Sequence, residues 1–385
     1  MISRTLYQNI QSRLDDPKAI ILHGPRQVGK TTLLQQLSTE IEADILWWNG
    51  DEPDIRSDLE NATSTWLKEQ IGKRKFLIID EAQRIENIGI VIKLIVDQIP
   101  GVKVIASGSS SFDLSNKINE PLTGRKWEFL LYPVSVQEMI EHHGERQEGR
   151  LLRNRLVYGS YPEIINHPGE EREYLKELAG SYLYKDILTW ENIQKPAKLE
   201  KLLQALAFQV GSQVSVNELS QTIGLDNHTI ERYIDVLEKA YIIFRLQPFS
   251  RNLRNEIKKS QKIYFYDNGI RNAVINQFSS FELRQDKGQL WENFLMCERR
   301  KMTHYHAKNV NRYFWRNHAQ QEIDFIEEIN GNVNAYEFKW NPKAKVFFSK
   351  SFINAYKPRV TEGVHNENYL RFVLPDDTED SIIEG

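Results

Sequence analysis

The chain has 385 residues, of which 40% are hydrophobic and 27% charged, and its formal net charge is −3. This length predicts two or three domains with hydrophobic cores. A net charge so close to zero excludes a generally basic nucleic-acid-binding protein, so any affinity for DNA has to come from local patches. The only cysteine, Cys297, excludes a disulfide framework and a cysteine zinc site. No apolar run approaches the roughly 18 residues of a membrane span, and the N-terminus lacks a signal-peptide pattern. We therefore expect a cytoplasmic protein without a membrane partner.

The first expected element is a short helix within residues 1–15, and the first motif is G-x-x-x-x-G-K-T at residues 24–31. An apolar run precedes the motif and leucines at helical spacing follow it, which is the strand–loop–helix context of a phosphate-binding loop. A bare glycine turn is the weaker alternative. The glycines let successive N–H groups point at phosphate oxygens, and the helix adds the positive end of its dipole. We expect a nucleotide partner, a nucleoside triphosphate bound together with Mg²⁺. The expected nucleotide-binding residues are Gly24, Pro25, Arg26, Gln27, Val28, Gly29, Lys30, Thr31 and Thr32; Lys30 also acts in catalysis and Thr31 also binds the metal.

Two acids end the next strongly apolar stretch, residues 75–81. Such a run predicts a strand buried on both faces, whose carboxyl end is where an α/β sheet places its ligand. Asp80 is expected to hold Mg²⁺, directly or through water, and Glu81 to act as the base toward the attacking water. The alternative is that both acids only cap the following helix. The phosphate loop upstream favours the catalytic interpretation.

A further buried strand, residues 102–106, leads into a serine-rich segment. Ser107 or Ser109 is placed to hydrogen-bond the γ-phosphate or its water, and we assign Ser109 to the nucleotide site. A serine-rich loop without a catalytic role is an open alternative. Arg125, after Leu122-Thr123-Gly124, is a candidate arginine finger for this subunit or for a neighbouring one in a homo-oligomer. A structural ion pair is its equal alternative.

Residues 151–270 are expected to form a helical lid followed by a winged helix-turn-helix. Aromatic residues and leucines at helical spacing in residues 174–190 predict the lid. Residues 216–225 predict a helix that ends at a glycine turn, and residues 228–240 a second helix, followed by a strand. The wing, residues 251–262, carries five basic residues against one acid and is a candidate for contacts with DNA phosphates. An internal connector between parts of the protein is an equal alternative.

Residues 271–385 are expected to form an α/β domain with a second site. The Asn330-Gly331 turn predicts a hairpin, and strand alternation places Glu337 and Lys339 on one face, where Asp324 of the preceding strand can join them. Two carboxylates with a lysine suit phosphodiester cleavage with a divalent metal: the acids bind Mg²⁺ and the lysine orients or deprotonates water. Glu292, on a predicted helix, is a further metal-ligand candidate. Ordinary surface alternation is the alternative.

Taken in order, these motifs resemble a bacterial and archaeal family of AAA-type ATPases. Its members join an ATPase domain, a winged helix and a C-terminal DUF4143 domain similar to PD-(D/E)xK nucleases. The segments that carry the resemblance are residues 24–31, 79–83, 107–110, 122–125, 132–133, 262–269, 291–294, 322–325 and 337–339. Ile323 departs from the usual proline before the motif acid.

The resemblance implies an α/β fold class with three domains. These are a P-loop AAA-type ATPase domain (1–150), a lid and winged helix-turn-helix (151–270) and a nuclease-like, restriction-endonuclease-like α/β domain (271–385). It also implies Mg²⁺-dependent ATP hydrolysis coupled to DNA binding or processing. The alternative is a non-cleaving ATP-dependent switch whose C-terminal domain recognises a protein or DNA partner. Both remain open at this point.

Overall fold

The computed structural model of the chain describes residues 2–41, 44–108, 122–181, 193, 195–249, 261–317 and 319–375. The chain divides into two compact units. The first comprises Met1–Val134 with Lys239–Tyr241, and the second comprises Ser135–Glu238 with Ile242–Gly385. The finer division into three domains at residues 150 and 270 stays a prediction.

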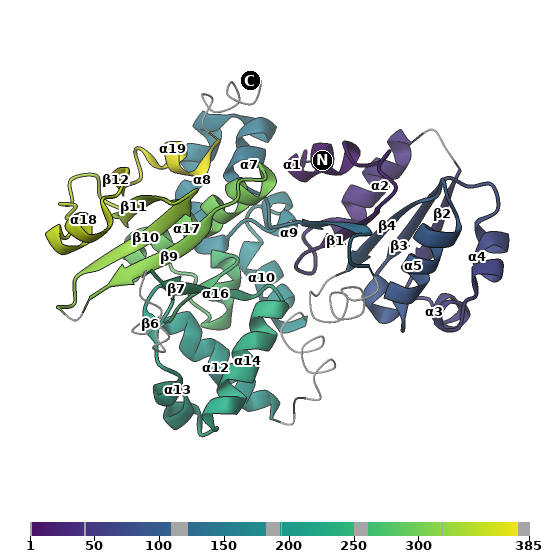
Figure 1. The fold of residues 1–385 in the computed structure, drawn as a ribbon. Coiled ribbons are helices and arrows are strands. Elements are labelled where there is room, and N and C mark those ends of the chain that lie inside the picture. Colours follow the sequence, from purple (N-terminus) through teal and green to yellow (C-terminus); the bar gives the residue numbers. More distant parts are fainter. Residues whose placement is uncertain are drawn as a thin grey trace, which may run out of the picture. The chain divides into compact units, whose positions relative to one another are not determined.

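The first unit is built on a five-stranded parallel sheet with the strand order β2-β3-β4-β1-β5. Figure 1 shows β1 to β4 side by side. The chain order of the elements is α1 (Thr5–Gln11), β1 (Ala19–His23), α2 (Lys30–Glu40), β2 (Ile45–Asn49), α3 (Pro53–Glu60), α4 (Ser64–Ile71), β3 (Phe76–Asp80), η1 (Ala82–Arg84), α5 (Ile88–Gln98), β4 (Lys103–Gly108) and β5 (Lys126–Leu130).

Both faces of this sheet are buried, which explains why its central strands have continuous apolar sequences. Ile21 and Ile79 belong to a core that includes residues of α3, α4 and α5. Their sequence neighbours Ile20 and Ile78 point to the opposite face and are equally inaccessible to solvent. A one-residue shift of register would therefore still bury apolar side chains. Since the strands are uniformly apolar, the residues with functional side chains lie in the loops that follow them.

The carboxyl ends of β1, β3 and β4 lie at one edge of the sheet. Strand β1 pairs with β4 as far as His23 opposite Gly108, and β3 pairs with β4 as far as Ile79 opposite Ala106. The phosphate-loop motif after β1 and the acids at the end of β3 therefore meet at the same edge. This is the arrangement expected of a ligand site in a parallel α/β sheet.

The second unit contains a helical part and a seven-stranded sheet with the order β12-β11-β10-β9-β7-β8-β6. Its helices are α7 (Val136–His143), α8 (Glu145–Tyr158), α9 (Pro162–Asn166), α10 (Glu171–Ser181), α12 (Pro196–Phe208), α13 (Val216–Ile223), α14 (Asn227–Lys239), α16 (Asn268–Val274), η3 (Phe281–Leu283), α17 (Lys287–Tyr305), α18 (Lys350–Tyr356) and α19 (Tyr369–Val373). Its strands are β6 (Gln213–Val214), β7 (Ile243–Pro248), β8 (Gln261–Phe265), β9 (Asn311–Arg316), β10 (Glu322–Ile329), β11 (Asn332–Phe338) and β12 (Val360–Val364).

The seven-stranded sheet joins the predicted winged helix-turn-helix region to the C-terminal region. Helices α13 and α14 flank a turn at Gly224, and strands β7 and β8 follow them as an antiparallel pair. Strand β7 then pairs in parallel with β9, at Gln247 opposite Tyr313 and Pro248 opposite Phe314. The hairpin after the two helices is therefore continuous with the sheet of the C-terminal region.

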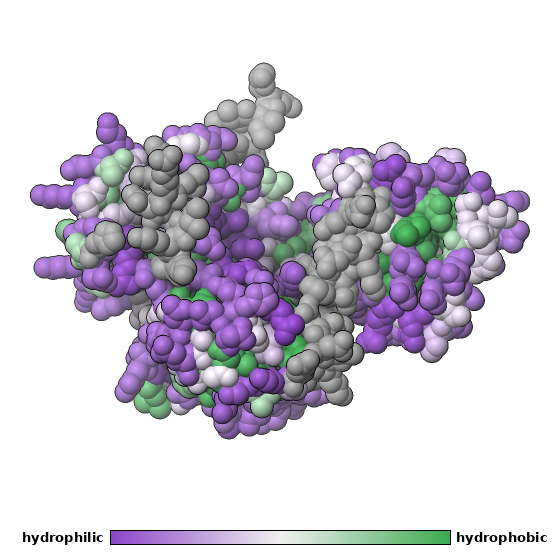
Figure 2. Space-filling model, turned by 60° about the horizontal axis from the view of Figure 1, so that its bottom comes forward, coloured by the Kyte–Doolittle hydropathy of each residue, from purple (hydrophilic) through white to green (hydrophobic). Residues whose placement is uncertain are grey.

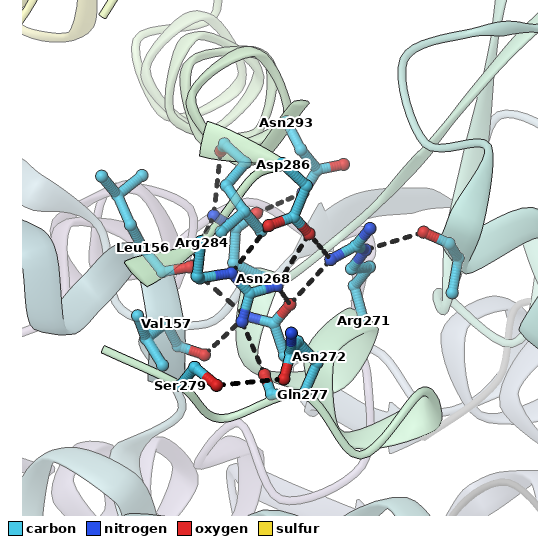
Figure 3. A network of polar contacts seen from close by, with 12 residues as sticks. Leu156, Val157, Asn268, Arg271, Asn272, Gln277, Ser279, Arg284, Asp286 and Asn293 are labelled. Carbon is cyan, nitrogen blue, oxygen red and sulfur yellow. Dashed lines mark hydrogen bonds and ion pairs between the residues drawn. The ribbon is translucent and has the colours of Figure 1, made fainter. Parts of the chain in front are cut away.

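A buried polar network ties α8, α16 and the start of α17 together (Figure 3). Arg271 and Arg284 both bind the carboxylate of Asp286, at 2.5 and 2.7 Å. Both also donate to the amide oxygen of Asn272, at 3.0 Å. The amide nitrogen of Asn272 donates to the carbonyl oxygen of Val157 at the end of α8, at 2.7 Å. Because a buried polar group is costly unless it is paired, this network fixes the position of α17 relative to the helical part.

The surface shown in Figure 2 is mostly hydrophilic, with hydrophobic side chains in separate patches rather than in a continuous band. Within the described ranges, no helix has the length and apolar character needed to cross a membrane. Helix α10 covers the first part of the expected lid, and residues 182–192 lie outside the described ranges.

Candidate functional site

The phosphate-loop motif forms the connection between β1 and α2. A β-carbon on Gly24 would lie 2.4 Å from the carbonyl oxygen of Leu131, so only glycine fits there. Gly29 has a φ of 93° and caps α2, so no side-chain oxygen competes for the N–H groups of the first helical turn. The ammonium group of Lys30 donates to the carbonyl oxygens of Gly24 and Pro25, at 3.0 and 2.7 Å. Lys30 thus spans the loop beside a helix start that suits an anion.

A chain of hydrogen bonds links Thr31, Asp80 and Ser107 at the same edge of the sheet. The Thr31 hydroxyl donates to one carboxylate oxygen of Asp80 at 2.8 Å. The Ser107 hydroxyl donates to the other oxygen, which also accepts the backbone N–H of Glu81 at 3.1 Å. Asp80 is 5% exposed and Ser107 is fully buried. A hydroxyl and a carboxylate in contact beside a phosphate loop are oxygen ligands of the kind that Mg²⁺ prefers, so these residues fit the expected ion.

The position of Glu81 is fixed by its backbone and by two neighbours. Its φ of 49° lies in the left-handed region, which is uncommon for a residue with a side chain. Its carboxylate accepts a hydrogen bond from the amide nitrogen of Gln83 at 2.5 Å. On the backbone side, a β-carbon on Gly50 would lie only 2.3 Å from the Glu81 carbonyl oxygen. The N–H of Gly50 also donates to the carbonyl oxygen of Asp80 at 2.8 Å. The two acids therefore depend on a glycine at the end of β2.

Arg4, which no sequence motif singles out, holds the phosphate loop in place. Its side chain is almost completely buried, and its guanidinium donates to the carbonyl oxygens of Val28 and Tyr132, at 2.8 and 2.6 Å. It therefore ties the loop to the segment that follows β5. Because the three residues are widely separated in sequence, no spacing rule reveals this contact.

The serine that contacts the acid of β3 is Ser107, one of the two candidates from the sequence. Ser109, which we assigned to the nucleotide site, lies outside the described residues. The role of either serine toward a phosphate stays a prediction. What the structure contributes is the hydrogen bond from Ser107 to Asp80, which fixes that carboxylate.

Arg125 lies away from the phosphate loop of its own chain. It directly precedes β5, which begins with Lys126 opposite Ala19 at the start of β1, whereas the loop follows the end of β1. The guanidinium of Arg125 binds Asp97 at 2.7 Å, and this hydrogen bond raises the pKa of Arg125. The ion pair is the structural alternative that the sequence left open. Its role as an arginine finger stays a prediction.

A second candidate site is a pocket of about 360 Å³ in the second unit. The structure brings Asp324 of β10, Glu337 of β11 and Lys339 together there. The Lys339 ammonium lies 3.0 Å from a Glu337 oxygen and 3.5 Å from an Asp324 oxygen. The same Asp324 oxygen accepts the backbone N–H of Phe338 at 2.8 Å. The lining residues are Gly211, Ser212, Gln213, Lys262, Glu292, Arg316, Glu322, Asp324, Glu337 and Lys339.

Glu292, on α17, lines this pocket but is bound to a second lysine. The ammonium of Lys262 lies 3.0 Å from Glu292 and 2.6 Å from Glu322. The Tyr264 hydroxyl donates to the same Glu292 oxygen at 2.6 Å. Glu322 is not among the residues predicted for this site, and the prediction that Lys262 belongs to the basic wing is wrong, because Lys262 lies in β8 and is 2% exposed. Residues 250–260, the rest of the wing, lie outside the described ranges.

The four carboxylates of the pocket are thus divided between two lysines. Lys262 holds Glu292 and Glu322, and Lys339 holds Asp324 and Glu337. Among the residues that the structure describes, no three or more His, Cys, Asp and Glu side chains are arranged to hold a metal ion. Glu292 therefore does not join the other two expected ligands. The remaining pair, Asp324 and Glu337, offers carboxylate oxygens that suit Mg²⁺ with water as the other ligands.

The pKa of Glu337 gives a prediction about stability. Burial, followed by repulsion from Asp324, raises this pKa to about 7, against the opposing effect of Lys339. The folded state then holds a proton that the unfolded state loses above its pKa of 4.5. Stability without metal should therefore fall as the pH rises from about 4.5 to about 7. Glu337→Gln should remove this fall, which amounts to at most about 3 kcal/mol. Urea unfolding in EDTA at about pH 5 and about pH 8 measures it.

The control for this prediction is Glu367→Gln, which changes an exposed acid of the same unit. This variant should keep the pH dependence of the wild type. If Glu337→Gln and the wild type lost the same stability between the two pH values, the raised pKa of Glu337 would be wrong.

Three family models match successive parts of the chain. Residues 16–140 match the model described as an AAA domain, residues 149–280 a domain of unknown function (DUF8612), and residues 287–373 a domain of unknown function (DUF4143). The AAA domain and the C-terminal DUF4143 domain implied by the resemblance are therefore present. The AAA match covers the phosphate loop and both acids at the end of β3, and the DUF4143 match covers all four pocket carboxylates, which lie on α17, β10 and β11.

Similar proteins occur in bacteria and archaea. An uncharacterized protein of Mycobacterium tuberculosis is 26% identical over 329 residues, covering 83% of this chain and 70% of that protein. One of Haemophilus influenzae is 24% identical over 302 residues, covering 72% and 74%. One of Methanocaldococcus jannaschii is 25% identical over 308 residues, covering 68% and 63%. A solved structure of Drosophila ORC bound to AT-rich DNA and Cdc6 aligns with a TM-score of 0.27 and 13% identity, over 71% of this chain and 90% of that one.

Proposed function

We propose that the AAA domain formed by residues 16–140 binds a Mg²⁺-bound nucleoside triphosphate, ATP in our expectation, and hydrolyses its γ-phosphate. The observation that carries this proposal is the 2.8 Å contact between Thr31 and Asp80 beside the loop that Lys30 spans. Lys30 and Thr31 begin α2 and Asp80 ends β3, and these two elements meet at this edge of the sheet. Positioning and charge stabilisation are most of what phosphoryl transfer asks of a protein.

Each of these residues has a separate task in the proposed reaction. Lys30 exchanges its loop carbonyl contacts for the phosphate oxygens, and the first-turn N–H groups of α2 hold the same anion. Thr31 and Asp80 would hold Mg²⁺, which neutralises charge that develops on the phosphates. Glu81 accepts the proton of the attacking water. Ser107 keeps the Asp80 carboxylate in the orientation that the ion requires.

Lys30→Ala should weaken nucleotide binding by roughly 100-fold, because a charged hydrogen-bond donor to phosphate is worth about 3 kcal/mol. Binding of a fluorescent ATP analogue in the presence of Mg²⁺ measures this effect. The matched control is Lys73→Ala, which removes an exposed lysine of the same unit and should bind like the wild type. Equal affinity in Lys30→Ala and wild type would exclude the proposed site.

We propose as a second function that the pocket in residues 211–339 handles a phosphodiester, so that nucleotide hydrolysis is coupled to DNA binding or processing. The convergence of Asp324, Glu337 and Lys339 supports this proposal. Asp324 and Glu337 would hold Mg²⁺, and Lys339 orients or deprotonates a water molecule. The rival proposal is a non-cleaving switch in which the C-terminal domain recognises a protein or DNA partner.

One observation supports the non-cleaving switch and argues against DNA recognition by α14. Three half-buried acids of this helix, Glu231, Asp235 and Glu238, bind Arg245 of β7, at 3.7, 2.5 and 2.6 Å, so this side of α14 is joined to the sheet. Since β7 also pairs with β9, we propose that the winged helix-turn-helix connects parts of this unit rather than reading DNA.

Nicking of supercoiled plasmid with Mg²⁺ or Mn²⁺ decides between the two proposals. If the pocket cleaves, Lys339→Ala should lose roughly 10²-fold or more in rate, as expected for a lost proton-transfer group. The matched control, Lys343→Ala, removes an exposed lysine of the following loop and should nick like the wild type. Equal nicking by Lys339→Ala and wild type, or no nicking by either, would exclude cleavage and leave the switch.

A further inference from the structure

We propose that Lys262 is a built-in cation that occupies the Glu292–Glu322 half of the pocket, so that the pocket admits a single divalent ion, between Asp324 and Glu337. This inference rests on the second proposed function, because it concerns the metal of that pocket. It adds a residue from outside the DUF4143 segment to the site, since Lys262 belongs to the part of the chain that matches DUF8612.

The surroundings of Lys262 are those of a bound cation. Its ammonium lies between two carboxylates, 3.0 Å from Glu292 and 2.6 Å from Glu322. The Tyr264 hydroxyl donates to the same Glu292 oxygen, at 2.6 Å. A divalent ion would need these oxygens at about 2.0–2.6 Å. The ammonium and the hydroxyl already use the same Glu292 oxygen, so that oxygen is not available as a metal ligand.

Lys262 cannot readily leave this position. Its side chain is 2% exposed, and its ammonium lies 5.6 Å from the centre of the Phe314 ring. Its backbone is in β8, between β7 and β6, where it pairs with Leu246 and Gln213. Burial by itself lowers the pKa of Lys262, but the nearby carboxylates outweigh it and raise that pKa, so the lysine keeps its charge. Moving it out would leave the largely buried Glu292 without its counter-charge, which is strongly unfavourable.

Lys339 has the opposite character. It is 37% exposed and lies 3.0 and 3.5 Å from its two acids, so its contacts are looser. It follows the end of β11 rather than lying within a central strand. A flexible four-carbon side chain at such a position can rotate toward solvent and let a divalent ion replace its ammonium. The two halves of the pocket therefore differ in which cation can be exchanged.

This asymmetry accounts for the absence of a three-acid metal cluster among the described residues. Because Glu292 and Glu322 are bound to Lys262, only Asp324 and Glu337 remain as potential metal ligands. In a two-metal site, a second ion stabilises the other oxygen of the phosphodiester. Here the fixed positive charge of Lys262 takes the place of that ion.

Counting Mn²⁺ ions per chain tests the inference without relying on activity. Free Mn²⁺ is measured by electron paramagnetic resonance during titration of the full chain, with Asp80→Asn in every arm to remove the nucleotide site. The parent should bind one ion. Lys262→Met should bind two, and its melting temperature should be low in EDTA and should recover with Mn²⁺. Lys262→Arg keeps the charge and should still bind one.

Two further variants keep the test decisive if Lys262→Met does not fold. Asp324→Asn should abolish Mn²⁺ binding, whereas Glu322→Gln should leave one ion bound, because Glu322 binds Lys262 and not the ion. Two ions in the parent, no additional ion in folded Lys262→Met relative to the parent, or loss of the ion in Glu322→Gln would each overturn the inference. No ion in the parent but one in Lys262→Met would uphold the role of Lys262 and remove the metal site of the second proposed function.

Discussion

Glu81→Gln is expected to slow nucleotide hydrolysis by roughly 10²–10⁴-fold and to leave nucleotide affinity nearly unchanged. Glutamine has the shape of the glutamate that Gln83 holds at 2.5 Å, but it cannot accept the proton of the attacking water. The rate loss should therefore appear in the chemical step. Phosphate release under saturating ATP and Mg²⁺ measures the rate, and binding of a fluorescent ATP analogue measures the affinity.

The matched control for Glu81 is Glu86→Gln. Glu86 is an exposed acid in the same segment between β3 and α5, so its replacement tests whether any loss of negative charge there slows the reaction. It should hydrolyse ATP at the wild-type rate. A Glu81→Gln variant that turned over normally would remove Glu81 from the role of base.

The second large effect is expected from Gly50→Ala. The added β-carbon would lie 2.3 Å from the carbonyl oxygen of Glu81, and that neighbour is backbone, so it cannot rotate away. The end of β3 has to move, and the hydrogen bond from the Gly50 N–H to the Asp80 carbonyl oxygen, now 2.8 Å, is strained with it. We expect a loss of roughly 1–3 kcal/mol in stability together with a large loss of hydrolysis. Thermal unfolding and phosphate release measure the two effects.

Gly149→Ala is the control for Gly50→Ala. Gly149 lies within α8, and nothing is within 4 Å of a β-carbon added there. Alanine should therefore stabilise the chain by roughly 0.5–1 kcal/mol and leave hydrolysis unchanged. If Gly50→Ala melted and hydrolysed ATP like the wild type, the close approach of β2 and the Glu81 backbone would not be a constraint on the site.

The nucleotide edge could be predicted because each of its parts follows a recognisable strand. The apolar runs before residues 24–31 and before Asp80 indicate strands, and parallel strands place their carboxyl ends together. The sequence does not reveal contacts between residues whose separation along the chain follows no recognisable pattern. Arg4 binds the carbonyl oxygen of Val28, 24 residues later in the chain, and Arg125 pairs with Asp97 of α5.

The second site could be predicted only in part. Strand alternation was enough to bring Glu337 and Lys339 together beside Asp324. It missed the second lysine because the basic residues near 251–262 were interpreted as one exposed wing. The sequence of β8 contains a pattern that predicts this site. Lys262 and Tyr264 alternate with Ile263 and Phe265, which indicates that the two polar side chains lie on the same face of the strand. A buried lysine in a central strand requires carboxylate partners.

A structure of the chain with Mg²⁺ and a non-hydrolysable ATP analogue tests the central claim most directly. We predict the β- and γ-phosphates against the loop of residues 24–31 and the first turn of α2, with Lys30 moved from the Gly24 and Pro25 carbonyl oxygens onto phosphate. The Mg²⁺ ion should lie beside the Thr31 hydroxyl and the Asp80 carboxylate. Phosphates bound elsewhere, or Lys30 still bonded only to the loop, would contradict the account.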